Sequence, residues 1–177
     1  RIVWDLGYDG AIDIIKKSDE NVENKEGLSY DGIRPKVVPG LYTAEINHFG
    51  QVLTSQISVI GDTRINMPVS EYEARLNALL ELRDLLSETH GLIDQFNSVI
   101  DQLSIFSVKL DSNSKSISQI TDTHSSSLAY KDENLMRPPP SMGYRQKPRL
   151  REEIKSLMRA IDMTTNPPTV PQLERIE

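Results

Sequence analysis

The first third of the chain alternates apolar and polar residues, as extended strands do. Between Pro39 and Ile65 two such runs flank Gly50. In the first run the apolar residues recur at every second position, and in the second they are spread among Thr, Ser and Gln: Tyr42, Ala44, Ile46, Val52, Ile57, Val59 and Ile60. A period of two places the apolar side chains on one face of a strand. Two runs joined at a glycine predict a β-hairpin whose apolar face can be buried.

The N-terminal residues predict a further strand. Ile2, Trp4 and Leu6 alternate with Arg1, Val3 and Asp5, which aims the Trp4 ring at a core. Together with Val37 and Val38, these runs predict a small antiparallel β-sandwich of the immunoglobulin-like kind over residues 1–66. With about four recognisable strands this unit is thin, and we expect it to be incomplete.

Residues 16–36 are rich in charged and small residues and predict a surface loop. The acids of Ser18–Asn24 invite a calcium interpretation. An EF-hand loop needs acids at alternate positions, a glycine at the sixth and a glutamate at the twelfth, and this segment lacks that pattern. A solvated loop is the better interpretation.

At Ser70 the hydrophobic period changes from two to about three and a half. Ser70 and Glu73 have the spacing of a capping box and predict the start of a helix. One face of this helix follows steps of three and four: Tyr72, Leu76, Leu79, Arg83, Leu86, His90, Ile93, Asn97 and Ile100. We expect a break around residues 111–114, after which a second helix carrying Ile117, Ile120 and Leu128 packs antiparallel to the first.

Prolines divide the rest of the chain. Residues 138–140 are three consecutive prolines and predict a stiff connector. A third helix follows with Leu150, Ile154, Leu157, Met158 and Ile161 on one face, and Thr169–Gln172 begins a fourth with a capping pattern. The sequence thus predicts an α+β protein with a helical bundle over residues 67–177. The sequence looks truncated at both ends, and we expect the bundle to be incomplete at its C-terminus.

Composition narrows the functional classes. The formal charge is −6, from 26 acids and 20 bases, so a nucleic-acid backbone would be repelled. No apolar run approaches the roughly 18 residues of a membrane-spanning helix, and no charged-then-apolar leader opens the chain. Cysteine is absent, which removes disulfides and thiolate metal sites.

No residue set predicts catalysis, a cofactor or a metal. His48, His90 and His124 are far apart, and none has a second ligand at the spacing of a zinc motif. His90 falls on the apolar stripe of the first helix, which favours a partly buried, hydrogen-bonded side chain over a ligand. No nucleophile elbow, P-loop or dinucleotide fingerprint occurs. We therefore predict no catalytic, cofactor-binding or metal-binding residue in this chain.

Several segments together resemble a known family. They are residues 3–6 (VWDL), 39–43 (PGLYT), the Gly50 hairpin, 62–65 (DTRI), 73–88 (EARLNALLELRDLLSE), 138–140 and 167–169. In this order they resemble the C-terminal region of large bacterial sortilin-like, BNR-repeat, glycosyl-hydrolase-like proteins. The resemblance covers most of the chain outside residues 10–35 and 104–135.

The resemblance implies an exported Gram-negative protein, extracellular, at the cell surface or periplasmic, with β-propellers upstream of this immunoglobulin-like and helical tail. The leading hypothesis is a non-catalytic accessory or protein-interaction module that braces those propellers or docks a protein partner. A second hypothesis makes it the tail of a secreted glycoside hydrolase or sortilin-like receptor whose active propeller lies upstream. A third is a carbohydrate-binding module that uses Trp4 and Tyr8. The sequence leaves the oligomeric state open.

Overall fold

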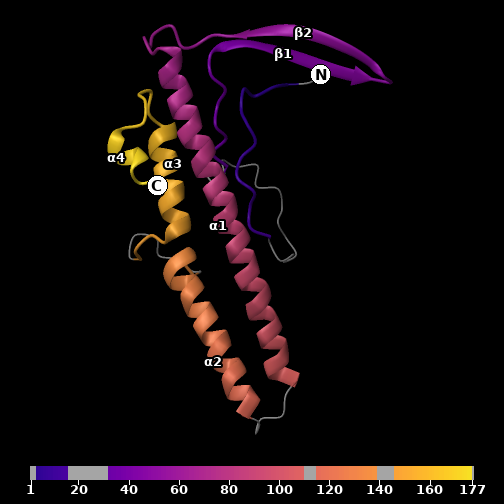
Figure 1. Ribbon diagram of the computed structural model, residues 1–177, viewed down its shortest axis with the longest axis vertical. Coiled ribbons are helices and arrows are strands. Elements are labelled where there is room, and N and C mark those ends of the chain that lie inside the picture. The colour runs from indigo at the N-terminus through magenta and orange to yellow at the C-terminus, as the bar shows by residue number, and fades with distance from the viewer. Residues whose placement is uncertain (1–2, 16–31, 110–114, 139–145, 177) are drawn as a thin grey trace.

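The computed structural model describes residues 3–15, 32–109, 115–138 and 146–176. Its elements are β1 (Gly40–His48), β2 (Gln51–Val59), α1 (Val69–Lys109), α2 (Lys115–Tyr130), the π-helical turn η1 (Lys131–Leu135), α3 (Leu150–Asp162) and α4 (Val170–Leu173). Figure 1 shows α1 as a long rod, with the β-hairpin projecting from one end as an arm. Helix α3 lies along the half of α1 near the arm, and α2 lies along the other half.

The hairpin pairs all nine residues of each strand, from Gly40 opposite Val59 to His48 opposite Gln51. The two turn residues, Phe49 and Gly50, have φ values of 48° and 81°. Positive φ at both central positions is what a type I′ turn requires, and this turn matches the twist of the flanking strands. The predicted hairpin is confirmed.

The arm joins the helical part where β2 has ended. A Cβ added at Gly61 would lie 2.9 Å from the Tyr72 hydroxyl and 3.3 Å from Pro39 Cγ, so only glycine fits this approach without a shift. Helix α1 then begins at Val69, with the Pro68 carbonyl accepting from the Glu71 backbone N–H at 3.0 Å. The predicted cap at Ser70 is wrong by two positions, because Pro68 precedes the first helical residue and Ser70 already lies inside the first turn.

The hydrophobic core lies between α1 and α3. Its buried members come from one stripe of each helix: Ala78, Leu79, Leu82, Leu86, Ile154, Leu157, Met158 and Ile161. The residues predicted for the third helix thus form the core, except that Leu150 stays 43% exposed. Thr169 and Gln172 form the predicted capping pair of α4, with the Thr169 N–H donating to Gln172 Oε1 at 2.9 Å.

Among the described residues, fewer side chains are buried where α1 packs against α2 than where it packs against α3. Ile93 is fully buried in the half of α1 next to α2, and Phe96 stacks on Tyr130 with ring centroids 5.5 Å apart. Ile117 and Ile120 are only half-buried. The predicted break at residues 111–114 lies outside the described residues; α1 ends at Lys109 and α2 begins at Lys115.

The predicted β-sandwich over residues 1–66 is wrong. Among the described residues there is one sheet, and it has two strands. Residues 3–6 form no strand, and the strand-type pairing of this segment among the described residues is a single isolated bridge between Gly7 and Lys36. Residues 12–15, further along, lie on α1, where helix side chains bind their backbone groups. Of the surface loop predicted over residues 16–36, residues 16–31, and with them the rejected calcium pattern, lie outside the described part of the chain.

Candidate functional site on the hairpin arm

The two faces of the arm differ in polarity. Because directly opposed residues share a face, the register places Tyr42, Ala44, Ile46, Leu53 and Ile57 on one side. The other side carries Thr43, Glu45, Asn47, Thr54, Gln56 and Ser58, with Leu41 and Val52 at its two ends. We call the first side the apolar face. The alternation in β1 predicts this face. In β2 the prediction is wrong at Val52, which lies on the other side, while Leu53 lies on the apolar face opposite Ile46.

Trp4 covers the part of the apolar face nearest the helices. Its ring meets the Tyr42 ring edge-to-face, with centroids 5.4 Å apart and planes at 64°. The Tyr42 hydroxyl donates to the Val38 carbonyl at 2.7 Å. Burial raises the pKa of the Tyr42 phenol and the neighbouring Tyr8 raises it further, while the hydrogen bond to Val38 opposes them. The phenol is therefore neutral at physiological pH, and the apolar face carries no charge there.

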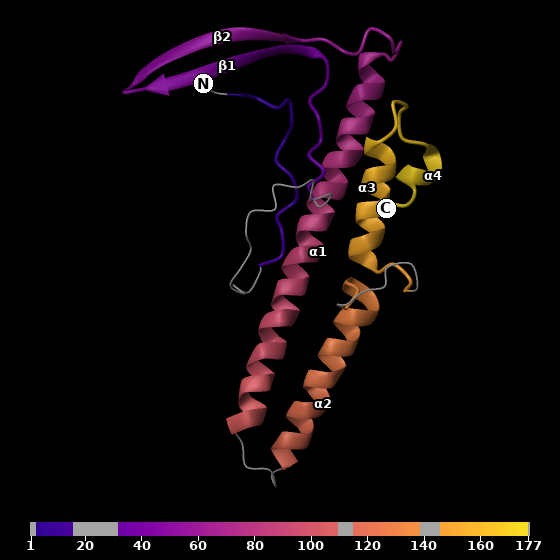
Figure 2. The same ribbon diagram turned by 180° about the vertical axis from the view of Figure 1, so that it is seen from behind.

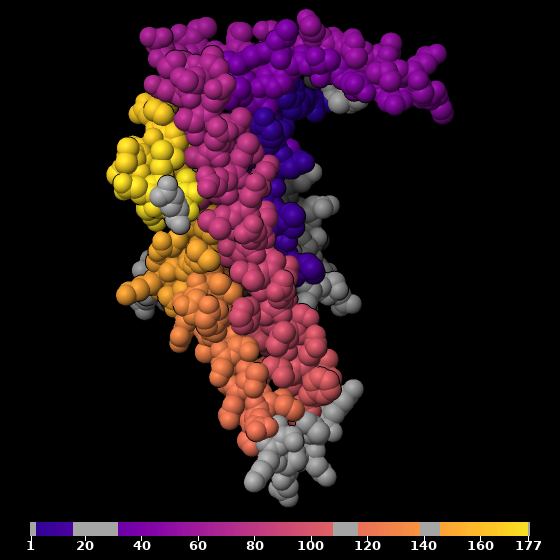
Figure 3. Space-filling model, in the orientation of Figure 1, coloured from indigo at the N-terminus to yellow at the C-terminus, as the bar shows by residue number. Residues whose placement is uncertain are grey.

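The outer part of the apolar face is open. Ile46 and Leu53, directly opposite each other, are 51% and 67% exposed. A cavity of about 500 Å³ runs from Trp4 along the strand to Ile46. Trp4 itself remains 40% exposed, so the predicted aim of its ring at a core is only partly met. In Figure 3 the arm extends well beyond the helical body.

The edges of the arm have none of the usual protection against pairing. Each strand is nine residues long and has one edge that no other described strand pairs. Between them the strands contain one residue of the Asp, Glu, Lys and Arg types, Glu45, and no proline. Exposed edges are normally blunted by charges, proline or bulges. This arm therefore offers both strand-pairing groups and an apolar face.

Phe49 stands at the tip of the arm and is 96% exposed. Its ring contacts only the His48 ring among the aromatic pairs of the described residues, with centroids 4.4 Å apart. A bulky residue at positive φ is uncommon, and the left-handed conformation costs a non-glycine residue roughly 1–2 kcal/mol. Asn or Asp is the usual residue before glycine in this turn. A large apolar side chain is thus held in solvent at a conformational cost.

We expect Phe49→Asn to stabilise the hairpin by about 1 kcal/mol, because asparagine tolerates the left-handed conformation. Amide hydrogen exchange across β1 and β2 should slow about fivefold. Phe49→Ala is the matched control, since it removes the ring but keeps a Cβ at the same φ. Equal slowing in both variants would show that the ring, and not the backbone, carries the cost.

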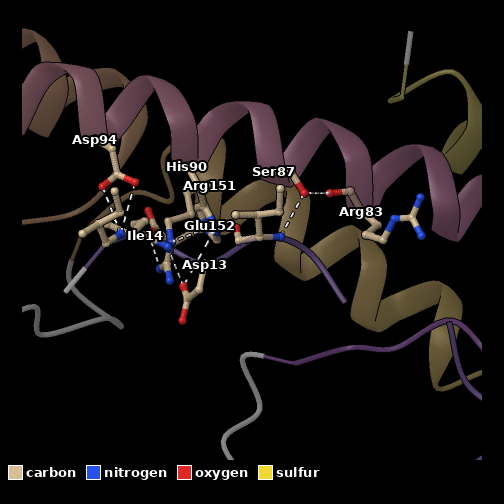
Figure 4. Close-up of polar contacts among 10 residues, drawn as sticks. Asp13, Ile14, Arg83, Ser87, His90, Asp94, Arg151 and Glu152 are labelled. Carbon is tan, nitrogen blue, oxygen red and sulfur yellow. Dashed lines mark hydrogen bonds and ion pairs between the residues drawn. The ribbon is translucent and has the colours of Figure 1, made fainter. Parts of the chain in front are cut away.

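A polar strip on α1 positions the segment that brings Trp4 to the arm. Ser87, His90 and Asp94 lie three and four residues apart, which places them on one helix face. Ser87 Oγ accepts the Ile12 N–H at 3.1 Å, and both Asp94 carboxylate oxygens accept the Ile15 N–H at 3.1 Å. Figure 4 shows this extended segment bound along the helix.

His90 is the buried centre of the strip, with 4% of its surface exposed. Its Nδ1 lies 2.6 Å from the Ile12 carbonyl, and its Nε2 lies 3.1 Å from Arg151 Nε. A carbonyl only accepts and a guanidinium only donates, so the ring must carry its proton on Nδ1. The neutral Nδ1–H tautomer thus joins three parts of the fold: the N-terminal segment, α1 and α3. The predicted role of His90 as a hydrogen-bonded, buried histidine is confirmed.

The histidines do not come together. His48 lies at the end of β1, His90 in the strip and His124, half-buried, on α2. Among the described residues, no group of three or more His, Cys, Asp and Glu side chains could hold a metal ion. None of the helices in the described ranges is long and apolar enough to cross a membrane.

Comparison with known proteins adds no assignment. A scan against protein-family models, a search of curated proteins and a search of solved structures each found no match to this chain.

Proposed function

We propose that this chain is a non-catalytic interaction module whose arm docks onto a β-structured protein partner. The observation that carries the proposal is the exposed, uncharged apolar face of a two-stranded hairpin whose edges are unprotected. A two-stranded hairpin is at best marginally stable in water, and further strands or a covering layer stabilise it. A β-structured partner can supply both kinds of stabilisation, because one of its strands can pair with an exposed edge and its sheet can cover the apolar face.

The lack of basic residues on the two strands argues against a membrane or a nucleic acid as the partner of the arm. A membrane or nucleic acid would be attracted through Lys and Arg, and neither strand contains one. The apolar face itself is a patch of about 30 by 10 Å, or roughly 300 Å². A stable interface needs about 800 Å² per partner, so a partner must also engage the strand edges of the arm. We therefore propose a β-structured partner surface that covers the apolar face and pairs with a strand edge.

The sequence resemblance supplies a candidate for that surface. In the sortilin-like, BNR-repeat proteins, this kind of tail follows β-propellers, which are built from antiparallel sheets. We propose that the arm braces such a propeller, or a strand-rich segment next to it, in an exported protein. The parent protein is then a secreted hydrolase or a sortilin-like receptor, and this chain contributes no reacting group.

Site-specific photo-cross-linking in cells tests the proposal. A photoreactive amino acid at Ile46 or Leu53 should cross-link to one polypeptide, whereas the same group at Thr54 or Gln56 on the opposite face should not. The cross-linked polypeptide is then purified and titrated into the intact chain while the fluorescence of Trp4, the single tryptophan, is recorded. A saturable blue shift supports docking on the apolar face. Equal cross-linking from both faces contradicts it.

We expect the double change Ile46→Thr and Leu53→Thr to weaken that titration by about tenfold to a hundredfold, because these exposed side chains become buried in the complex. Threonine is β-branched and therefore suits a strand at both positions. The matched control is Leu41→Thr with Val52→Thr, which removes two exposed apolar side chains from the other face. Its affinity should stay within about threefold of the parent chain.

Phe49→Asn adds a second measurement to the same titration. If the exposed ring is kept for a partner pocket, this variant should bind at least tenfold more weakly although its hairpin is more stable. Unchanged affinity would leave the strained turn without a binding role.

A carbohydrate-binding module is the second candidate, favoured by the exposure of Trp4 beside the cavity. Glycans stacked on the indole should change its fluorescence, since ring stacking excludes water from one face. The cavity offers few polar side chains for sugar hydroxyls, because Thr43 and Glu45, which also line it, belong to the other face of the arm, and the Tyr42 hydroxyl already donates to Val38. We therefore place this candidate second, and an unchanged spectrum during glycan titration would remove it.

A further inference from the structure

A stripe of exposed apolar side chains runs along α1, beside the faces that pack on α2 and α3. Leu92, Val99 and Phe106 follow one another at intervals of seven residues, which places them on one side of the helix. They are 45%, 45% and 54% exposed. Figure 3 shows the surface of α1 uncovered along most of its length. Apolar residues at this spacing are typical of a helix that packs against another helix.

The stripe continues into an apolar cavity beside the core. Leu85 lies seven residues before Leu92, is packed against the core, and lines a cavity of about 450 Å³. The other apolar residues around this cavity come from α1, α3 and the C-terminal segment: Leu82, Leu150, Ile154, Leu157 and Ile176. Four apolar positions at equal intervals thus form one face, with a hollow at one end and the Phe106 ring at the other.

Few charges lie near this face. From residue 92 to residue 107 the sequence has two charged residues, Asp94 and Asp101. Each comes two positions after a stripe residue and therefore lies on the opposite side of the helix. The polar residues next to the stripe are Gln95 and Gln102, three positions after stripe residues. An identical face can therefore approach without charge repulsion, although the chain has a formal charge of −6.

We propose that a second copy of the chain packs on this face, with the two α1 helices antiparallel about a two-fold axis that passes between residues 95 and 96. In this register Leu92 faces Val99 of the second copy, and Leu85 faces Phe106 of the second copy, because the members of each pair are equally far from the axis. The aromatic end of each stripe then lies at the level of the cavity of the other copy. Each contact occurs twice, as a two-fold interface requires.

The same register accommodates the acid nearest to the stripe. Glu88 comes three residues after Leu85 and is exposed. In an antiparallel pair it lies beside Gln102 of the second copy, so no two acids meet. The glutamines on this side of the stripe carry no charge that would select a different, oppositely charged helix. These positions therefore favour a second copy over an unrelated helical partner.

The area of the face is sufficient for a dimer. From Leu85 to Phe106 the stripe extends about 32 Å, at about 1.5 Å per residue. Together with the helix beside it, α1 presents a face about 20 Å wide, or roughly 640 Å² on each copy. Two such faces bury roughly 1,300 Å², which exceeds the roughly 1,000 Å² expected of a biological interface. The contact involves neither strand of the arm and is independent of the docking function.

Sedimentation equilibrium of the whole chain tests the proposal. We expect a dimer with a Kd of about 10 μM or below, because an interface of this size supports a specific complex of moderate affinity. A chain that stays monomeric up to about 100 μM would overturn the proposal.

The double change Leu92→Gln with Val99→Gln should raise this Kd at least tenfold, because four apolar side chains per dimer lose their burial. The matched control, Ile105→Gln with Ile60→Gln, replaces two exposed apolar side chains outside the stripe and should change the Kd less than about twofold. Well below the Kd the stripe is exposed, so the variant should keep nearly the urea midpoint of the parent chain. Equal changes of Kd in the two pairs would contradict the assigned face.

Cysteine cross-linking tests the register, because the chain has no cysteine of its own. Gln95 lies next to the proposed axis, so Gln95→Cys should link to the same position of the second copy under mild oxidation. Gln102→Cys is the matched control on the same side of the stripe, since its two copies would lie about 20 Å apart along the helices. Both changes leave the apolar stripe intact, so they decide the matter even where the glutamine variants fold poorly. Cross-linking at both positions, or at neither, would overturn the antiparallel dimer.

Discussion

Replacing Leu82 with alanine is expected to destabilise the protein by about 3 kcal/mol, because the change leaves a cavity in the core between α1 and α3. Leu82 is 1% exposed and belongs to the cluster that includes Met158 and Ile161. The core has few other members, so little packing is available to close the gap. Urea denaturation followed by circular dichroism measures the free energy of unfolding and should show a lower midpoint with a similar slope.

Leu92→Ala is the matched control on the same helix. Leu92 is 45% exposed, and its truncation should cost less than about 1 kcal/mol. Similar losses for the two variants would mean that the contacts of α3 with α1 do not form the dominant core.

The elements whose pattern is local were predictable from the sequence. Alternation around Gly50 predicted the hairpin and the β1 residues of its apolar face, whereas in β2 it predicted Val52 in place of Leu53. The spacing of Ile154, Leu157, Met158 and Ile161 gave both α3 and the residues that it buries. In each case one element's own periodicity determines the outcome.

The β-sandwich was wrong for a physical reason. Alternation tells which side of a strand is apolar, but not which other element covers it. Residues 3–6 alternate, yet they contact residues 34–37 and the Tyr42 ring without forming a strand of a sheet. Residues 12–15, further along the same segment, find hydrogen-bond partners on α1 at Ser87, His90 and Asp94. Polar residues spaced three and four apart beside an apolar stripe indicate such a helix-bound segment. Of the three, the sequence analysis predicted a hydrogen-bonded role for His90.

Only part of the candidate site could be predicted from the sequence. The apolar face of the arm was predicted, whereas its exposure depends on the absence of a covering layer among the described residues. Phe49 was missed, although a two-residue turn of Phe and Gly between equal strands requires positive φ at the phenylalanine.

Replacing His90 with alanine is expected to destabilise the protein by about 3 kcal/mol. The change removes the donor to the Ile12 carbonyl and the acceptor for Arg151 Nε, and it opens a void in a buried position. A buried polar group left without a partner costs about 1–3 kcal/mol, and a charged one more. Because the ring joins three parts of the fold, amides of residues 10–15 should lose protection along with the first turn of α3. Urea denaturation and hydrogen exchange measure the two effects.

Ser87→Ala is the control for the same strip, since it removes one exposed hydrogen bond to the Ile12 N–H and should cost less than about 1 kcal/mol. The tautomer offers an independent check that involves no mutation. Nitrogen-15 shifts of the His90 ring should show a protonated Nδ1 and an unprotonated Nε2, because only that form satisfies both neighbours. A ring protonated at Nε2 alone would place two donors against each other, and the proposed link between the N-terminal segment and α3 would then be wrong.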